Sequence, residues 1–350
     1  MSEQRLARWQ PLRDYCQKLF AAQGMPADEA FLVADSLVDA DLNGVDSHGV
    51  SRVPIYMKRL EEKVVEKACR IETEREFPGS LALNAHNSMG IVAGVRAMEM
   101  GIQKAKESGF VLVTVNHSNH FGTAAYFAKM ALEHRMIGFA ATNAPSTMAP
   151  WGGIQPYLGT NPFAVAIPAG REHPVVMDMA TSVVAQGKII MAAKKNEPIP
   201  AGWAITKDGR PTTDPAAALE GSVLPFGGPK GYAIALLIEI LSGILSGATF
   251  GPHLNNMWND FTHPQNVGHC FGALDIAKFT DPDQFFANMD RMIGEIKSAP
   301  AAQGVDEIFL PGEIERRKSE QRRSEGIPLT PVVYEDLRKL GEKWQVPFWE

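Results

Sequence analysis

Two short apolar segments separated by one helix-length segment are the feature that most constrains how this chain folds. Residues 110–115 read FVLVTV, a run rich in β-branched side chains that is typical of a buried strand, and residues 136–142 read MIGFAAT. The segment between them, Thr123–His134, predicts a helix. A strand, a helix and a second strand form a β-α-β unit, so the sequence predicts an α/β core.

The rest of the chain adds elements on both sides of this unit. Short apolar runs predict strands, and apolar residues at helical spacing predict helices, with a helix junction at Val45–Val53. The expected strands are Ser80–Asn84, Phe163–Ile167 and Val175–Met179; the expected helices are Pro11–Gln23, Ala27–Asn43, a third after Pro54, Ile91–Ser108, Ser182–Lys194, Asp283–Lys297, a solvated charged helix over Gly312–Ser324 and a last one from Thr330-Pro331.

One apolar stretch, Tyr232–Phe250, approaches the length of a membrane span. Glu239 lies in its middle, and a carboxylate at the centre of a bilayer costs on the order of 3 kcal/mol. The flanking residues are Gly and Pro turns rather than basic anchors. The stretch therefore predicts a buried core helix and no membrane partner.

Charge and cysteine content exclude several classes of function. The 34 Lys and Arg against 40 Asp and Glu give a net charge of −6, which disfavours a nucleic-acid partner. The three cysteines, Cys16, Cys69 and Cys270, fit neither a disulfide framework nor a zinc ribbon, and a reducing cytoplasm is expected. The start MSEQRLARWQ has no apolar run behind its charges, so neither a secretory signal nor an anchor is expected there.

The first polar cluster with chemical potential is DSHGVSR at Asp46–Arg52. Neutral imidazole and imidazolium exchange near neutral pH, and a guanidinium can bind a carboxylate through two hydrogen bonds. His48 and Arg52 therefore suit a small hydroxy or oxo acid, although a helix-junction histidine bonded to its neighbours is an equally simple interpretation of His48.

The second cluster, NHSNHFG at Asn116–Gly122, follows the best-defined strand. The carboxyl end of a strand is where α/β sheets bind ligands. His117 and His120 are spaced as a possible metal pair, but no supporting Cys or carboxylate is near in sequence, so a catalytic histidine is the preferred hypothesis.

Three further turns could hold anionic groups. Neither G-x-G-x-x-G nor G-x-x-x-x-G-K-[ST] occurs in the chain, so a nucleotide would bind by another route. Asp178–Ser182 ends a strand and begins a helix, whose free N–H groups could meet a pyrophosphate. Lys230 lies at the start of an apolar helix, where a cation is misplaced unless an anion joins it. The glycines of the 152–162 loop can equally be two tight turns with no ligand.

Taken together, these segments resemble the malate/L-lactate dehydrogenase-like oxidoreductases. This family also includes ureidoglycolate, sulfolactate and 2,3-diketogulonate enzymes and Δ1-piperideine-2-carboxylate reductases. The resemblance runs nearly end to end and is carried by DSHGVSR, by HFG at His120–Gly122, by PWGG and LGTNP between Pro150 and Pro162, by MDMATSVVAQGK at Met177–Lys188 and by GGPKGY at Gly227–Tyr232.

The resemblance implies a NAD(P)-dependent reduction of a 2-oxo acid, or oxidation of the matching 2-hydroxy acid, on a non-Rossmann α/β core with a mixed sheet. It implies a helical domain formed by residues 1–77 and completed by residues 305–350, an α/β domain over residues 78–304, and a homodimer. NAD is the expected cofactor and NADP is possible. Malate, lactate, sulfolactate and ureidoglycolate types of substrate stay open, as do cyclic imino acids and diketo sugar acids.

The resemblance also implies roles for individual residues. His48 and His120 are the candidates for proton transfer, without a choice between them, and Arg52, Ser47 and Asn143 are the substrate contacts. The expected cofactor contacts are Thr160, Asp178, Met179, Ala180, Lys230, Gly231, Pro311, Gly312 and Glu313. Two interpretations from other classes are kept open: a metal-dependent lyase or hydrolase that uses His117 and His120, and a non-catalytic interaction protein.

Overall fold

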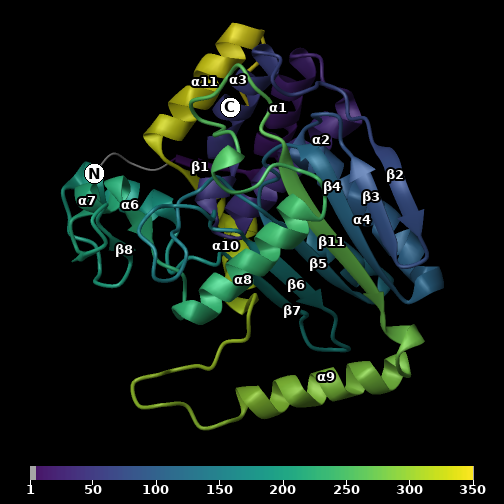
Figure 1. The fold of residues 1–350 in the computed structure, drawn as a ribbon. Helices are drawn as coiled ribbons and strands as arrows, with labels where there is room; N and C mark the ends of the chain where they lie inside the picture. The colour runs from purple at the N-terminus through teal and green to yellow at the C-terminus, as the bar shows by residue number, and fades with distance from the viewer. Residues whose placement is uncertain (1–4, 350) are drawn as a thin grey trace.

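A mixed sheet of seven strands forms the centre of the computed structural model, which describes residues 5–349 (Figure 1). Strands β3 and β4 are parallel, and every other neighbouring pair in this sheet is antiparallel. The strands lie in the order β2 (Glu72–Phe77), β3 (Ser80–Asn84), β4 (Phe110–Ser118), β11 (Val267–Asp275), β5 (Met136–Thr142), β6 (Phe163–Ile167) and β7 (Val175–Met179). The predicted α/β class with a mixed sheet is confirmed.

The predicted β-α-β unit is present with one strand inserted into it. Strands β4 and β5 are both antiparallel to β11 and therefore point the same way, and α5 (Ala124–Ala128) with η3 (Lys129–His134) connects them. Cys270 of β11 pairs with Thr114 on one side and with Ala141 on the other. The sequence analysis missed β11, because its letters VGHCFGALD contain two glycines and lack the β-branched run that marks β4.

Helix α4 (Gly90–Ser108) covers one face of the sheet, as the sequence predicts for residues 91–108. Its buried residues, among them Met98 and Ile102, share a core with Val113 of β4 and with Phe127 of α5. Every one of these four side chains is essentially inaccessible to solvent. This core fixes the carboxyl ends of β4 and β5 along the same edge of the sheet.

The apolar stretch 232–250 is not the single buried helix that the sequence predicts. It forms α8 (Pro229–Glu239), which continues as one π-helical turn, η4 (Ile240–Ile244). One side of η4 packs closely on β11, so that a Cβ at Gly268 would lie 1.7 Å from the carbonyl oxygen of Ser242. Leu237, Ile244 and Leu245 are each more than half exposed. The prediction is wrong because only one side of this segment meets the sheet.

The carboxylate in the middle of this stretch is fully bonded. Glu239 is buried and accepts hydrogen bonds from the side-chain amides of Asn143 and Asn161 and from the backbone N–H of Gly251. Within residues 5–349, no helix is both long enough and apolar enough to cross a bilayer.

The N-terminal helices and the C-terminal tail share a second core. Leu19, Phe20, Leu37 and Leu337 belong to it, and the hydroxyl of Tyr15 donates to the carbonyl oxygen of Leu337 at 2.8 Å. The elements involved are β1 (Arg5–Ala7), α1 (Trp9–Ala22), α2 (Ala27–Leu42), α3 (Val53–Glu61), β12 (Ile327–Leu329), which pairs with β1, and α11 (Pro331–Trp344). The four helices gather at the top of Figure 1. The predicted helices are confirmed, including the Thr330 cap, whose hydroxyl accepts from the N–H of Val333.

A small lobe lies beside the sheet and has its own core. Val184, Ile189, Ile199 and Val223 contribute to it. It contains α6 (Gln186–Lys195), β8 (Ala204–Ile205), β9 (Pro211–Thr212), α7 (Pro215–Glu220) and β10 (Ser222–Val223). Helix α6 begins later than the sequence predicts, because Val183 donates its N–H to the carbonyl oxygen of Leu224 and holds the preceding residues as a loop.

The remaining helices lie outside these cores. Helix α9 (Pro282–Lys297) runs along the bottom of Figure 1 and buries Phe286, Met289 and Ile293, and the predicted helix over Asp283–Lys297 is confirmed. Helix α10 (Glu313–Glu325) buries none of its residues, as expected for a solvated charged helix. The short turns η5 (Gly251–His253) and η6 (Ile276–Lys278) flank the segment that leads into and out of β11.

Candidate active site

The junction between α2 and α3 carries the first set of predicted site residues. Two 3-10 turns, η1 (Asp46–His48) and η2 (Val50–Arg52), meet at Gly49. The carboxylate of Asp41 accepts the N–H of Val50 at 2.8 Å, and a Cβ at Gly49 would lie 1.9 Å from Oδ1 of Asp41. Burial raises the pKa of Asp41 to about 8. A glycine is therefore required where this buried carboxyl group holds the junction.

Helix α10 holds the same junction from the C-terminal side. The Nη1 atom of Arg322 donates both to the carbonyl oxygen of Asp41 and to the carboxylate of Asp46. The side chain of Arg322 is largely covered. The tail therefore fixes the segment that carries His48 and Arg52.

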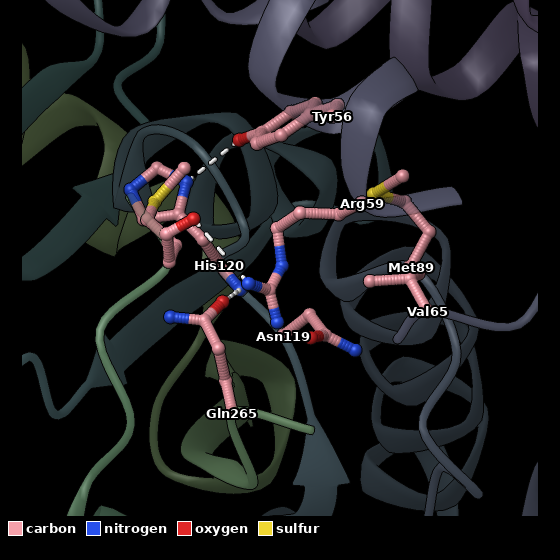
Figure 2. A pocket seen from close by; sticks show the side chains of 8 residues that line it. Tyr56, Arg59, Val65, Met89, Asn119, His120 and Gln265 are labelled. Atoms are coloured by element: carbon pink, nitrogen blue, oxygen red, sulfur yellow. Dashed lines mark hydrogen bonds between the residues drawn. The ribbon is translucent and has the colours of Figure 1, made fainter. Parts of the chain in front are cut away.

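The two predicted histidines meet in the structure. The rings of His48 and His120 are stacked, with centroids 5.6 Å apart and an interplanar angle of 24°. Nδ1 of His48 lies 2.9 Å from the hydroxyl of Ser47. Nδ1 of His120 lies 2.6 Å from the hydroxyl of Tyr56 (Figure 2). Each ring is thus held through Nδ1, which leaves its Nε2 atom for a substrate.

The electrostatics of this pair favour neutral rings. Burial, with a smaller effect of Arg52, lowers the pKa of His48 to about 4. Burial, followed by the nearby His48, Arg52 and His269, lowers the pKa of His120 well below its usual value. Burial raises the pKa of Tyr56, so Tyr56 is protonated and donates its hydrogen to Nδ1 of His120. Neutral His120 therefore carries its own proton at Nε2.

Arg52 lies close to this pair with its hydrogen-bonding groups unused. Its guanidinium carbon is 4.5 Å from the ring centroid of Trp258, and within residues 5–349 it forms no ion pair. Its Nε atom is buried and has no hydrogen-bond partner in the described part of the chain. A half-buried guanidinium in this state is suited to bind a carboxylate.

Asn143 is placed differently from the other predicted substrate contacts. Its amide donates to Glu239 and to the carbonyl oxygen of Thr249, and its oxygen accepts the N–H of Gly268. These bonds fix the carboxyl end of β5 to α8 and β11. The described contacts do not join Asn143 to either histidine.

His117 lies apart from the histidine pair. It lines a separate open cavity at the same edge of the sheet, with His86, Asn87 and Asn266. Its backbone has a φ of 47°, and its Nδ1 lies 2.8 Å from Oδ1 of Asn116. Across residues 5–349, no three His, Cys, Asp or Glu side chains are grouped so that they could hold a metal ion.

Several residues of this site carried no signal in the sequence. Tyr56 and Arg59 lie on α3, and Gln265 precedes β11. With His120 they line a small cavity (Figure 2). Gln265 accepts the backbone N–H of His120 at 3.2 Å. Tyr56 shows the apolar spacing of a core residue, so only its hydroxyl could have marked it.

The segments predicted to bind a cofactor lie along β7 and around its carboxyl end. The N–H of Thr181 donates to the carbonyl oxygen of Thr160 at 2.8 Å, and the N–H of Phe226 donates to the carbonyl oxygen of Thr181 at 3.0 Å. The N–H of Val176 in turn donates to the carbonyl oxygen of Pro311 at 3.0 Å. Residues 160, 178–180, 230–231 and 311–313 thus belong to neighbouring turns.

These turns offer groups that suit a dinucleotide. Gly227 and Gly228 have φ of 57° and 64°, and they lead into the N-terminus of α8, where Lys230 is exposed and has no ion-pair partner among the described residues. A Cβ at Gly227 would meet nothing within 4 Å, so the turn is open to a ligand. Backbone N–H groups and a lysine at a helix N-terminus are the donors that a pyrophosphate prefers.

Two carboxylates lie among these turns. Asp178 accepts the N–H of Ala125 at 3.2 Å, and burial raises its pKa to about 6. Glu313 accepts from Lys297 at 2.8 Å and from the N–H of Leu310 at 3.1 Å. Gly312, with a φ of 92°, packs against Val176. Pro311, Gly312 and Glu313 therefore shape the turn, while Met179 exposes its side chain beside it.

The chain is similar to proteins of known family and structure. The family described as malate/L-lactate dehydrogenase matches residues 8–338. The chain is 42% identical to an L-sulfolactate dehydrogenase of Methanothermobacter thermautotrophicus and 40% identical to a malate/(S)-sulfolactate dehydrogenase of Methanothermus fervidus, over 94% of this chain and 94% and 95% of the relatives. The solved sulfolactate dehydrogenase of Methanocaldococcus jannaschii superposes with a TM-score of 0.93 at 37% identity, over 98% of both chains.

Proposed function

The chain belongs to the malate/L-lactate dehydrogenase family as an NAD(P)-dependent oxidoreductase of 2-hydroxy acids, and we propose that His48, Arg52 and His120 form its active site. The observation that carries the proposal is the stacked pair of His48 and His120. His48 comes from the junction between α2 and α3, His120 comes from the loop after β4, and the two rings lie 5.6 Å apart beside Arg52. Titratable rings brought together at the carboxyl end of a strand are the expected feature of a proton-transfer site.

In this proposal the substrate is held by Arg52 and protonated by a histidine. Two N–H donors of the guanidinium bind the carboxylate of the 2-oxo acid and orient its carbonyl group. Nε2 of a neutral histidine takes the hydroxyl proton during oxidation, and the imidazolium that forms returns this proton to the carbonyl oxygen during reduction. The bound nicotinamide supplies or accepts the hydride.

The turns around Thr160, Asp178–Ala180, Lys230-Gly231 and Pro311–Glu313 fit this cofactor. Lys230 and the N–H groups at the start of α8 would hold the pyrophosphate, and the exposed Met179 side chain would contact an apolar part of the cofactor. We propose NAD as the natural cofactor. Asp178 and Glu313 are the carboxylates on these turns, and a carboxylate beside the ribose would repel the additional phosphate of NADP.

For the substrate we propose a small 2-oxo acid of the malate or sulfolactate type. The names of the similar relatives support this class. Ser47 is proposed to fix the tautomer of His48, to which it bonds. Asn143 is proposed to have an indirect role: its hydrogen bond to Glu239 holds the end of β5 in place.

We further propose a homodimer, formed through the exposed apolar face of α8 and η4. Leu236, Leu237, Ile240, Ile244 and Leu245 are all exposed on this segment, and apolar patches of this kind mark protein interfaces. The division into residues 1–77 with 305–350 and residues 78–304 is proposed from the two cores. A cytoplasmic location is proposed, and the free thiols of Cys16, Cys69 and Cys270 support it.

The test is oxidation of NADH and NADPH, in parallel, with a panel of 2-oxo acids and one cyclic imino acid. We expect turnover with oxaloacetate or sulfopyruvate and a lower KM for NADH. His48→Gln and His120→Gln are then compared, and the larger loss of kcat identifies the ring that transfers the proton. Lack of turnover together with lack of NADH binding in a titration would disprove the proposed function.

A further inference from the structure

One loop, residues 254–265, contacts both the substrate-binding arginine and one of the histidines. It connects η5 with β11 and forms neither a helix nor a strand. Trp258 lies against Arg52, and Gln265 accepts the backbone N–H of His120 at 3.2 Å. The position of this loop therefore bears on both proposed functions of the site.

The contact between Trp258 and Arg52 has a particular geometry. The guanidinium carbon of Arg52 lies 4.5 Å from the ring centroid, so the cation rests on the face of the indole. A cation over the face of a ring is held without an ion-pair partner, so the in-plane N–H donors of the guanidinium stay available for a carboxylate. An ion pair with a carboxylate would instead occupy the same donors that the substrate needs.

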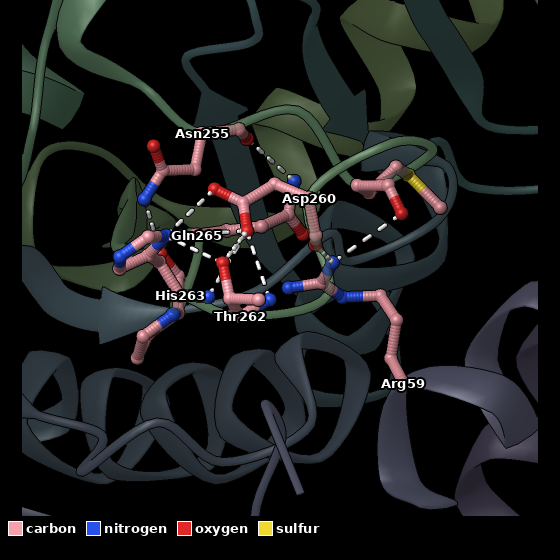
Figure 3. Close-up of polar contacts among 8 residues, drawn as sticks. Arg59, Asn255, Asp260, Thr262, His263 and Gln265 are labelled. Atoms are coloured by element: carbon pink, nitrogen blue, oxygen red, sulfur yellow. Dashed lines mark hydrogen bonds and ion pairs between the residues drawn. The ribbon is translucent and has the colours of Figure 1, made fainter. Parts of the chain in front are cut away.

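The loop is fastened on both sides of Trp258. Arg59, which is only 2% exposed, donates from Nη1 to the carbonyl oxygens of Met257 at 3.3 Å and Asp260 at 2.7 Å (Figure 3). Two points on either side of the tryptophan are therefore fixed to helix α3, the helix that Arg52 immediately precedes.

A second set of bonds closes the loop after Trp258. The carboxylate of Asp260 accepts the N–H groups of Thr262 and His263 at 2.9 and 3.0 Å (Figure 3). Chiefly the bond from the Thr262 N–H lowers the pKa of Asp260 to about 2, so the turn is intact across the neutral range. The loop is a built support and not a loose connection.

From these contacts we propose that Trp258 is a positioning residue that holds the plane of Arg52 for the carboxylate of the substrate. The proposal rests on the proposed role of Arg52 in substrate binding. Trp258 is 52% exposed, so its own burial contributes little to the core, and its effect is exerted through the guanidinium that it supports. It is a role that none of the sequence motifs assigns.

The experiment compares Trp258→Leu, Trp258→Phe and the wild-type enzyme with the 2-oxo acid that the panel identifies. In Trp258→Leu we expect the KM for the acid to rise about three- to thirtyfold. This range corresponds to the loss of a cation–π contact, whose energy depends on how far the contact is shielded from water. The value of kcat and the KM for the nucleotide stay within about twofold. Trp258→Phe keeps an aromatic face and restores most of the affinity.

Two controls separate positioning from a structural effect. Phe279→Leu removes an exposed aromatic ring directly after η6, outside the loop, and leaves the KM for the acid unchanged. The matched 2-oxo amide, which has no carboxylate, shows the same KM in the wild-type enzyme and in Trp258→Leu. The melting temperature of each variant is measured alongside.

The outcomes distinguish this inference from the proposed function. An unchanged KM in Trp258→Leu, with a raised KM in Arg52→Lys, overturns the positioning role and leaves the role of Arg52 intact. An unchanged KM in both variants disproves the role of Arg52 itself. A Trp258→Leu variant that loses kcat and affinity for acid, amide and nucleotide alike shows a structural role and also overturns the inference.

Discussion

The hydroxyl of Tyr56 lies 2.6 Å from Nδ1 of His120, and this bond joins helix α3 to the loop that follows β4. Tyr56 is buried, and burial keeps it protonated, so the hydrogen points to the histidine. A histidine whose tautomer is set by a neighbouring donor is a common feature of general acids and bases.

Removing this hydroxyl tests the importance of the tautomer. In Tyr56→Phe we expect kcat to fall about two- to tenfold, since one hydrogen bond that holds the ring is lost while the packing is kept. Tyr126→Phe is the matched control, because the Tyr126 hydroxyl donates to Asp35 and does not contact either histidine. Equal kcat values in the two variants would contradict the role of Tyr56.

The lowered pKa of His48 predicts the pH profile of hydroxy-acid oxidation. On the proposal that His48 is the base in this direction, the ring is already neutral well below pH 6.5, because burial and Arg52 lower its pKa to about 4. We expect kcat/KM for oxidation to be flat through the neutral range and to fall only below about pH 5. Steady-state rates over this range provide the measurement, and a midpoint near the ordinary value of 6.5 would contradict it.

Asp41 predicts a pH dependence of stability. Its pKa is about 8 in the folded chain and 3.8 for the ordinary carboxyl group, so between these values the folded state binds more protons than the unfolded state. The free energy of unfolding therefore falls as pH rises through this window. Asp41→Asn removes the ionisation and keeps an acceptor for the Val50 N–H. Its melting temperature relative to wild type should rise from pH 5 to pH 8, and a constant difference would refute the interpretation.

The contact between Gly49 and Asp41 predicts that even a methyl group is harmful at the junction. A Cβ at Gly49 would lie 1.9 Å from Oδ1 of Asp41, so Gly49→Ala must displace a buried carboxyl group. We expect a loss of about 1–3 kcal/mol in the free energy of unfolding and a raised KM for the acid. Gly187→Ala on α6, where a Cβ meets nothing within 4 Å, is the control in the same denaturation experiment.

The exposed face of α8 and η4 predicts how a charge affects assembly. Leu237 is 54% exposed at the centre of this face, and a carboxylate there would be buried between two copies of the chain. Leu237→Glu should yield monomers in sedimentation velocity, while the same change at Val332, which is 69% exposed on α11, leaves the dimer intact. Unaltered sedimentation of Leu237→Glu would place any interface elsewhere.

The fold could be predicted from the sequence wherever a strand has a uniform apolar run. The sequence analysis gives the bounds of β3, β5, β6 and β7 as the structure has them. In β3, β5 and β6 buried residues alternate with partly exposed ones over most of the strand, which is the pattern that a local window detects. It missed β11 because a strand between two others can be built from small residues, such as Gly268 and Gly272, whose neighbours supply the bulk. The pairing of β11 with β4 and β5 depends on contacts between residues distant in sequence, so a short stretch of sequence does not reveal it.

The site could be predicted only where its chemistry is unusual in sequence. His48, Arg52 and His120 stand in polar clusters, and the structure brings them together. Tyr56 and Trp258 were missed, since each is an aromatic residue of ordinary spacing and its role depends on contacts made across the fold. Asn143 shows the opposite case: it is polar and follows a strand, yet its bonds are all made within the protein.

The insertion of β11 between β4 and β5 also determines the order in which parts of the chain fold. A chain leaving the ribosome already contains β4 and β5 long before residue 267 appears, and their facing edges have no partner until then. Pairing across such a sequence separation is slow, because the loop must close before the contacts form. The carboxyl edge that carries His120 and Gln265 is therefore completed late, so a truncated or stalled chain exposes two open strand edges and holds no finished site.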